Sequence, residues 1–380
     1  MAAPTDRPTT RPPKQEQEDA VAEVTEVAPG ILRLQLPIKI SGLGHVNCYA
    51  LEDADGFTLV DPGMPGPANW KALLDRLGRA GAGIGHVHGV VVTHSHPDHF
   101  GGAGKVRVES GARVITSTSF RTWFDPATEG DDVVEEPGAA GDAAARAAEE
   151  RDERPPPLPK FTGRETPWGG KHPTPPLSFR VKMKLLGPLR RRWMVPPRPS
   201  VRLADAETIV LGGREWVAVH TPGHTSDHLC LYDPTEGVLL AGDHVLPTIT
   251  PHIAGHTPRA GGDEAVPGDP LADFFDSLDK VTALEGVTTV LPAHGHPFSD
   301  LAGRADAIKV HHRERLDLLR AASDGLGEAT VEELSHELFR PRSWGPMADS
   351  ETYAHLEHLR LAGEVECRRV DGLLRYRRVS

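Results

Sequence analysis

The chain has 380 residues, of which 38% are hydrophobic and 25% charged, and a formal net charge of −12 at pH 7. Because a single hydrophobic core stops growing at roughly 250 to 300 residues, this length predicts a main domain and a smaller second one. The negative charge disfavours indiscriminate nucleic-acid binding, which depends on contacts to phosphates. The three cysteines, Cys48, Cys230 and Cys367, form no CxxC pair, so we expect neither disulfides nor a thiolate metal site.

The N-terminal segment 1–22 is polar and rich in proline, and it lacks the apolar stretch of a signal peptide. We expect a disordered leader there. No apolar run approaches the about 18 residues of a membrane helix. We therefore expect a cytoplasmic protein with no membrane partner.

Short strand-like runs open the folded part at 31–36, 47–51 and 57–61, each ended by Gly, Pro or Asp turn signals. A helix should follow, because Trp70, Leu73, Leu74 and Leu77 share one face at the i, i+3, i+4, i+7 spacing. The β-branched run 89–93 predicts a strand covered on both faces, and 113–116 predicts another.

From 119 to 200 the pattern becomes irregular, which indicates an insertion. Its acidic first part is followed by a Pro-rich, basic part that includes Arg190, Arg191 and Arg192. The basic stretch is either a solvated face or a cationic lid that attracts an anionic substrate such as a coenzyme A or glutathione thioester.

Regular structure resumes with strands expected at 208–211, 215–220, 228–232 and 238–241. A second amphipathic helix should carry Leu271, Phe274, Phe275 and Leu278 on one face, before a strand at 287–291.

The last residues, 303–380, have a different pattern. A helix at about 305–321, a capping box at 330–333, a third helix with Tyr353, and a hairpin across the turn at 371–372 predict a winged-helix-like domain. One interpretation of such a domain is a packing or homodimerisation module. The alternative is that its arginine-rich last segment 360–378 contacts RNA. The predicted main domain is 23–302.

Four candidate metal ligands lie within one short segment after the strand 89–93: His94, His96, Asp98 and His99. Imidazole and carboxylate donors suit a borderline divalent ion such as zinc. Four ligands are too few for two ions, but three more candidates each follow an apolar strand directly. These are His224, Asp243 and His294.

In this order of motifs the sequence resembles the metallo-β-lactamase superfamily over about residues 25 to 300. The resemblance implies an α/β fold, an αββα sandwich with the metals at one edge of the two sheets, and a dinuclear centre holding two Zn²⁺, or Mn²⁺ or Fe²⁺ with the same ligands. It also implies a division of the ligands, with His94, His96 and His224 on one ion, Asp98, His99 and His294 on the other, and Asp243 bridging them.

Two such ions would share a water and lower its pKa from about 16 towards 7, so that a bridging hydroxide is the expected nucleophile. Asp98 is the expected catalytic residue, since it can orient the nucleophile or pass on its proton. The chain resembles glyoxalase II-like hydrolases, which implies a thioester or related acyl ester as substrate. The alternatives are a metal-dependent endoribonuclease and a sulfur dioxygenase that uses one iron.

Other histidines have simpler explanations. His86 and His88 precede the strand that ends at the motif, so His88 should lie roughly 20 Å from His94 at about 3.3 Å per residue. By contrast, His228, His244 and His252 are candidates for the pocket wall or for contacts behind the ligands. We expect His311 and His312 on the surface of a helix.

Overall fold

The computed structural model describes residues 14–40, 42–122, 166–170, 177–178, 192–254 and 268–379. Predictions for the first residues of the leader, for the acidic part of the insertion and for the basic stretch up to Arg191 lie outside these residues. Within them, no helix has the length and apolar character needed to cross a bilayer.

The first sheet has seven strands that are paired in chain order. Strands β1 to β4 run antiparallel, whereas β4 to β7 run parallel, so that the carboxyl ends of β4, β5 and β6 meet at one edge. The strands are Val24–Ala28 (β1), Ile31–Ile40 (β2), Leu43–Asp53 (β3), Gly56–Val60 (β4), Val87–Val91 (β5), Arg113–Ser117 (β6) and Val201–Leu203 (β7).

The second sheet has five strands in the order β12-β11-β10-β9-β8. The β11–β12 pair is parallel and the others are antiparallel. The strands are Thr208–Leu211 (β8), Arg214–His220 (β9), Leu229–Asp233 (β10), Val238–Gly242 (β11) and Thr289–Pro292 (β12).

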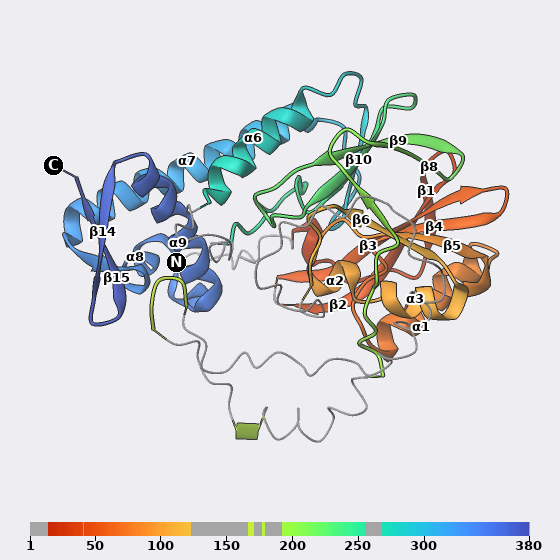
Figure 1. Cartoon of the computed structure of the whole chain (residues 1–380), viewed down its shortest axis with the longest axis horizontal. Coiled ribbons are helices and arrows are strands. Elements are labelled where there is room, and N and C mark those ends of the chain that lie inside the picture. Colours follow the sequence, from red (N-terminus) through yellow and green to blue (C-terminus); the bar gives the residue numbers. More distant parts are fainter. Residues whose placement is uncertain are drawn as a thin grey trace, which may run out of the picture.

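The two sheets face each other across a buried core to which both contribute, with Trp216 from β9 fully buried among residues such as Val91 of β5. Helices α1 (Pro67–Arg79) and α3 (Ala103–Ser110) cover the outer face of the first sheet. Helices α6 (Pro270–Thr282) and α7 (Leu301–Leu326) cover the second (Figure 1). The architecture is therefore the predicted αββα sandwich.

Most expected strands and helices of the main domain are present, often with longer bounds, but two strands were missed. Strand β1 has a mixed burial pattern without clear alternation, and β7 has only three residues at the end of the irregular insertion. The prediction of a disordered leader to residue 22 is wrong for its last part. Residues Gln15–Gln17 form a short 3₁₀ helix, and the buried Glu16 accepts hydrogen bonds from the backbone N–H of Thr248 at 2.7 Å and of Ile249 at 3.0 Å.

The C-terminal region contains helices and a three-stranded sheet ordered β13-β15-β14. The predicted capping box is present, with the Thr330 side chain and Glu333 satisfying each other's backbone N–H groups. The elements that follow α7 are Ala329–Thr330 (β13), Val331–Leu338 (α8), Pro346–Leu361 (α9), Val365–Val370 (β14) and Leu373–Arg378 (β15).

One continuous apolar core joins this region to the second sheet. It includes Leu239 of β11, Phe274 of α6, Leu316 of α7 and Leu356 of α9. The predicted domain boundary at residue 303 falls in the first turn of α7, and no gap in the packing marks it. The C-terminal region is thus built onto the sandwich.

The insertion is not irregular throughout its predicted length of 119–200, because its segment 166–170 packs on the C-terminal hairpin. The Leu374 N–H donates to the Trp168 carbonyl at 2.8 Å, and Gly169 forms a bridge with Leu373. The Trp168 ring lies 5.5 Å from the ring of Tyr353 between centroids. This part of the insertion is therefore fixed to the C-terminal region.

Candidate metal centre

The candidate ligands lie where strands end at one edge of the sandwich. His94 and His96 are in the loop after β5, and Asp98 and His99 are in the short helix α2 (Pro97–Phe100) that follows. The chain then returns to the same edge three times, after β9, β11 and β12, to place His224, Asp243 and His294.

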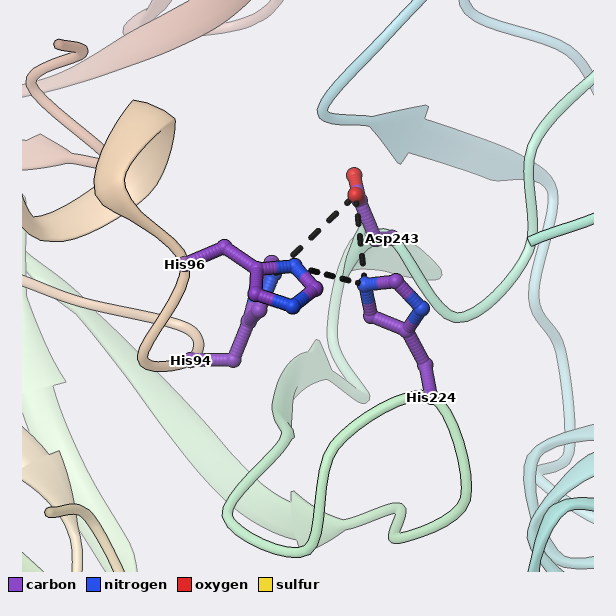
Figure 2. Close-up of side chains that lie close together, drawn as sticks. All are labelled: His94, His96, His224 and Asp243. Carbon is purple, nitrogen blue, oxygen red and sulfur yellow. Dashed lines mark hydrogen bonds and ion pairs between the residues drawn. The ribbon is translucent and has the colours of Figure 1, made fainter. Parts of the chain in front are cut away.

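Three imidazoles form one group. The His96 Nδ1 atom lies 3.0 Å from His94 Nε2 and 3.1 Å from His224 Nε2. Figure 2 shows these rings and the Asp243 carboxylate pointing toward one another, with His94 and His96 on one loop and His224 and Asp243 on others. His94 and His224 are buried, and His96 is partly exposed, which leaves the group open on one side.

The second group consists of Asp98, His99 and His294, all of them buried. The Asp98 Oδ2 atom lies 3.6 Å from both His99 Nε2 and His294 Nε2. This second group therefore offers two imidazole nitrogens and one carboxylate oxygen as metal ligands, a set that zinc and related ions bind.

The Asp243 carboxylate lies between the groups. Its Oδ2 atom is 3.5 Å from His224 Nε2 in the first group and 3.5 Å from His99 Nε2 in the second. Its Oδ1 atom is 3.3 Å from His294 Nε2. The structure therefore brings all the predicted ligands together, in the two sets that the resemblance implies.

Hydrogen bonds behind the rings fix which nitrogen faces the centre. The Nδ1 atoms of His224 and His294 each lie 2.6 Å from a backbone carbonyl, that of His252 and His45 respectively. Because a carbonyl only accepts, each ring must donate from Nδ1 and direct the Nε2 lone pair inward. His99 does the same through Nδ1, which is 2.9 Å from Asp61 Oδ2.

Several of the atoms that face the centre have no hydrogen-bond partner among the described residues. The buried atoms His99 Nε2, His294 Nε2 and Asp243 Oδ1 lack any hydrogen-bond partner there. In the first group, His96 Nδ1 has one proton at most to share between the Nε2 atoms of His94 and His224, so one of these two nitrogens is left without a good donor. Buried polar atoms without partners are costly, and a divalent cation is the partner that this donor set fits.

The pKa values point the same way. Burial lowers the pKa of His96 to about 4 and that of His224 to about 3, so both rings are neutral ligands at pH 7. Burial opposes a charge on His99 as well, but the carboxylates of Asp243, Asp98 and Asp61 raise its pKa well above the ordinary value. Without an ion, a proton on His99 supplies the positive charge that these carboxylates require.

Asp61 was not predicted as part of the site. Its carboxylate accepts from Thr93 N at 2.8 Å and from Thr93 Oγ1 at 2.7 Å, in addition to His99. It follows β4 directly, as the predicted ligands follow their strands, and its φ of +55° is unusual for a residue other than glycine. A polar residue at the end of an apolar strand was the signal available in the sequence.

Asp227 was missed too. The Ser95 hydroxyl, inside the ligand motif, donates to Asp227 Oδ1 at 3.2 Å. Burial raises the pKa of the Asp227 carboxyl to about 6.

Three histidines that were not predicted as ligands are placed as expected, with one away from the centre and two in contact with ligand residues. His88 binds Asp53 Oδ1 at 3.1 Å at the beginning of β5, away from the ligands, and His228 Nε2 accepts from the Asp243 N–H at 3.1 Å. His252 contributes its carbonyl to His224. His244 is buried with no hydrogen-bond partner among the described residues.

The family model described as the metallo-beta-lactamase superfamily matches residues 41–294, which include every candidate ligand. This chain belongs to the metallo-β-lactamase superfamily. It is a metal-dependent hydrolase with the His/Asp metal-binding site typical of a dinuclear centre in that superfamily.

Two solved structures are similar along nearly the whole chain. A metallo-beta-lactamase family protein from Thermus thermophilus is 30% identical with a TM-score of 0.68, covering 93% of this chain and 100% of that one. A beta-lactamase domain protein from Burkholderia ambifaria is 26% identical with a TM-score of 0.66, covering 95% and 96%. Both alignments extend over the C-terminal region.

Among curated proteins, the probable metallo-hydrolase YqjP of Bacillus subtilis is 24% identical over 295 residues, which are 77% of this chain and 80% of YqjP. A hydroxyacylglutathione hydrolase of Francisella tularensis subsp. novicida is 33% identical over 104 residues, or 27% of this chain and 37% of that enzyme. An atrochrysone carboxyl ACP thioesterase of Aspergillus fumigatus is 28% identical over 151 residues, or 37% and 32%. Similarity to the two thioester hydrolases is therefore partial.

Proposed function

We propose that this metallo-hydrolase cleaves a thioester or related acyl ester at a dinuclear zinc centre. The observation that supports two ions is the position of Asp243, whose Oδ2 lies 3.5 Å from an imidazole of each group. When bound, the two ions supply a water of lowered pKa and polarise the substrate carbonyl. The ligands that we propose are His94, His96 and His224 for one ion, Asp98, His99 and His294 for the other, and Asp243 for both.

The chain's own residues orient these groups. Asp61 and the carbonyls of His45 and His252 each hold one ligand ring by its Nδ1 atom. We assign to the Asp98 carboxylate the role of orienting the attacking water or passing on its proton, since it is buried at the contact with both His99 and His294. Buried surroundings strengthen each of these electrostatic interactions.

The substrate class is supported by the partial similarity to a hydroxyacylglutathione hydrolase and to an acyl carrier protein thioesterase. A cationic lid at Arg190–Arg192 is an expectation that depends mainly on residues outside the described ones. The thioester proposal therefore depends on the centre and on this partial similarity.

The endoribonuclease alternative receives less support, because most arginines of the C-terminal hairpin are paired with carboxylates, while Arg369 donates to the Gly372 carbonyl. Arg368 binds Glu328, Arg377 binds Glu366, and Arg378 Nη1 lies 2.9 Å from Glu364 Oε2. Exposed pairs of this kind neutralise much of the positive charge that phosphate binding requires. An iron-dependent sulfur dioxygenase needs only one ion and would leave the second group without a role.

A parallel assay tests the proposal. Purified protein is incubated with S-lactoylglutathione, an acyl-CoA, a lactone and single-stranded RNA, and bound metals are quantified in the same preparation. We expect release of free thiol and at least about two zinc ions per chain, the number that the proposed catalytic centre would hold.

The matched controls are Asp98→Ala, which should abolish turnover while the far-UV circular dichroism spectrum is retained, and Asp75→Ala, an exposed carboxylate on α1 that should have no effect. Cleavage of RNA without thioester hydrolysis would establish the endoribonuclease instead. A fully active Asp98→Ala enzyme would contradict the role given to Asp98.

A further inference from the structure

A second cluster of metal-binding side chains lies outside the catalytic centre, between α7 and α9. It consists of His312 from α7 and of Glu351 and His355 from α9, whose candidate ligand atoms all lie within 4.8 Å of one another. Both histidines are fully buried, and the Glu351 side chain is 13% exposed. The prediction that His312 lies on the surface is therefore wrong, because α9 covers it.

The contacts define which atoms face one another. The His355 Nδ1 atom lies 2.7 Å from the carbonyl oxygen of Glu351, so this nitrogen donates and His355 Nε2 carries the lone pair. His312 Nδ1 lies 3.0 Å from that Nε2 atom. His224 and His294 at the catalytic centre show the same arrangement, with Nδ1 bonded to a carbonyl and Nε2 directed at the other ligands.

The protonation states suit a cation. Burial lowers the pKa of His312 to about 2 and that of His355 to about 4, which keeps both rings neutral. Burial alone would raise the pKa of Glu351, but the hydrogen bond from His252 and the charge of Arg315 lower it to about 2. Two neutral imidazoles and one ionised carboxylate form a donor set that zinc commonly uses.

The groups around Glu351 leave its carboxylate only loosely held. Arg315 Nη1 lies 3.5 Å from Oε1, and His252 Nδ1 lies 3.3 Å from Oε2. Both distances exceed the about 2.7–2.9 Å of strong charge-assisted hydrogen bonds. The His312 Nε2 atom has no hydrogen-bond partner among the described residues, so no contact there fixes the position of its ring proton, and the ring can take the tautomer that turns the Nδ1 lone pair toward the other two ligands.

From this geometry we propose that the cluster is a third divalent-cation site, of zinc type, with His312 Nδ1, His355 Nε2 and a Glu351 carboxylate oxygen as protein ligands. Binding moves the His312 ring proton from Nδ1 to Nε2 and releases no proton. The site does not depend on the proposed catalytic function. Because His252 also gives its carbonyl to His224, the ion would tie the C-terminal helices to the loop behind a catalytic ligand.

Equilibrium dialysis of the full chain against Zn²⁺, followed by metal analysis, tests the site. We expect about three ions per wild-type chain and about two for His312→Gln and for His355→Gln, because zinc sites in proteins commonly use at least three protein ligands. The control His336→Gln removes an imidazole from α8 that stacks on Trp344, and it should retain the wild-type number.

Two further measurements keep the outcome clear. An Asp243→Ala chain, damaged at the catalytic centre, should still bind an ion that is lost when His355→Gln is added. If the substituted chains fail to fold, anomalous diffraction at the zinc edge from wild-type crystals decides, with a peak expected between His312 and His355. A wild-type chain that never exceeds two equivalents and shows no such peak overturns the proposal and leaves a hydrogen-bonded histidine pair.

Discussion

The Asp61 carboxylate accepts a hydrogen bond from His99 Nδ1 at 2.9 Å. The same carboxylate accepts from Thr93 Oγ1, and that hydroxyl, having donated to Asp61, accepts from His94 Nδ1 at 3.0 Å. One carboxylate at the end of β4 therefore orients a ring in each of the two groups. Its own position depends on strand pairing, because the Asp61 N–H donates to the Val91 carbonyl at the end of β5.

Replacing Asp61 with alanine should weaken metal binding. Without the carboxylate, His99 and His94 are no longer held with Nε2 directed inward, and loss of such a contact typically lowers metal affinity about 10- to 100-fold. Competition with a chromophoric zinc chelator measures the change. Asp75→Ala, on the exposed face of α1, is the matched control, and equal affinities for the two variants would show that Asp61 does not orient the ligands.

Replacing Asp243 with alanine should affect both halves of the centre at once. Its carboxylate lies within 3.5 Å of His224 and His99 and 3.3 Å from His294. We expect the loss of at least one zinc equivalent after dialysis and a fall in turnover beyond the about 10- to 100-fold typical of residues behind the ligands. Metal analysis combined with the thioester assay measures both, and retention of both catalytic ions would exclude a bridging role.

The sequence could predict which side chains gather at the candidate centre because each follows an apolar, β-branched strand, and strand ends gather at one edge of a sandwich. His224 and Asp243 also depend on glycines whose conformation is locally encoded. Gly242 has a φ of +51°, and a Cβ there would lie 2.6 Å from His228 Nε2. The short sequences Pro-Gly-His and Gly-Asp thus indicated a backbone conformation that residues other than glycine rarely adopt.

Features that depend on distant packing were harder to predict. The environment of His312 depends on His355 and on the aromatic rings of α6, such as Phe274 at 5.6 Å between centroids. Asp61 resembled an ordinary turn residue, since its partners Thr93 and His99 come more than 30 residues later. Local pattern determines which residues form a strand or helix, but not what a neighbouring element brings against them.

Zinc binding should depend on pH differently in the two groups. In the absence of metal, burial lowers the pKa of His96 to about 4 and that of His224 to about 3, so protons compete there only in acid. Burial opposes protonation of His99 and His294, but the nearby carboxylates raise the pKa of both above the ordinary value. An ion must therefore displace protons from the second group.

We expect the affinity of the second group to fall as the pH is lowered from about 7.5 to about 5.5, while that of the first changes little. Equilibrium dialysis across this range should show one catalytic equivalent lost before the other, and calorimetry in buffers of different ionisation enthalpy should detect proton release with the weaker ion. The His355→Gln background removes the additional site between α7 and α9 from the count. Simultaneous loss of both catalytic ions would contradict this order.

Asp227→Asn should stabilise the folded chain at neutral pH. Burial raises the pKa of the Asp227 carboxyl from 3.8 to about 6, and its Oδ2 atom has no hydrogen-bond partner among the described residues. Since the folded-state pKa is the higher one, the native state binds the proton more tightly, and this contribution is present below about pH 4 and lost as the pH rises through about 6. Burying the carboxylate then costs on the order of 3 kcal/mol. An amide stays neutral and still accepts from Ser95.

Urea unfolding of zinc-saturated protein should therefore give a larger free energy of unfolding for Asp227→Asn at about pH 7.5, and the gain should shrink towards about pH 4.5. Asp205→Asn is the opposite control: burial favours a higher pKa for Asp205, but hydrogen bonds from Lys280 and the His220 N–H lower it, so this variant should lose stability at neutral pH. A gain for Asp227→Asn that does not change with pH would show that its origin is not the buried charge.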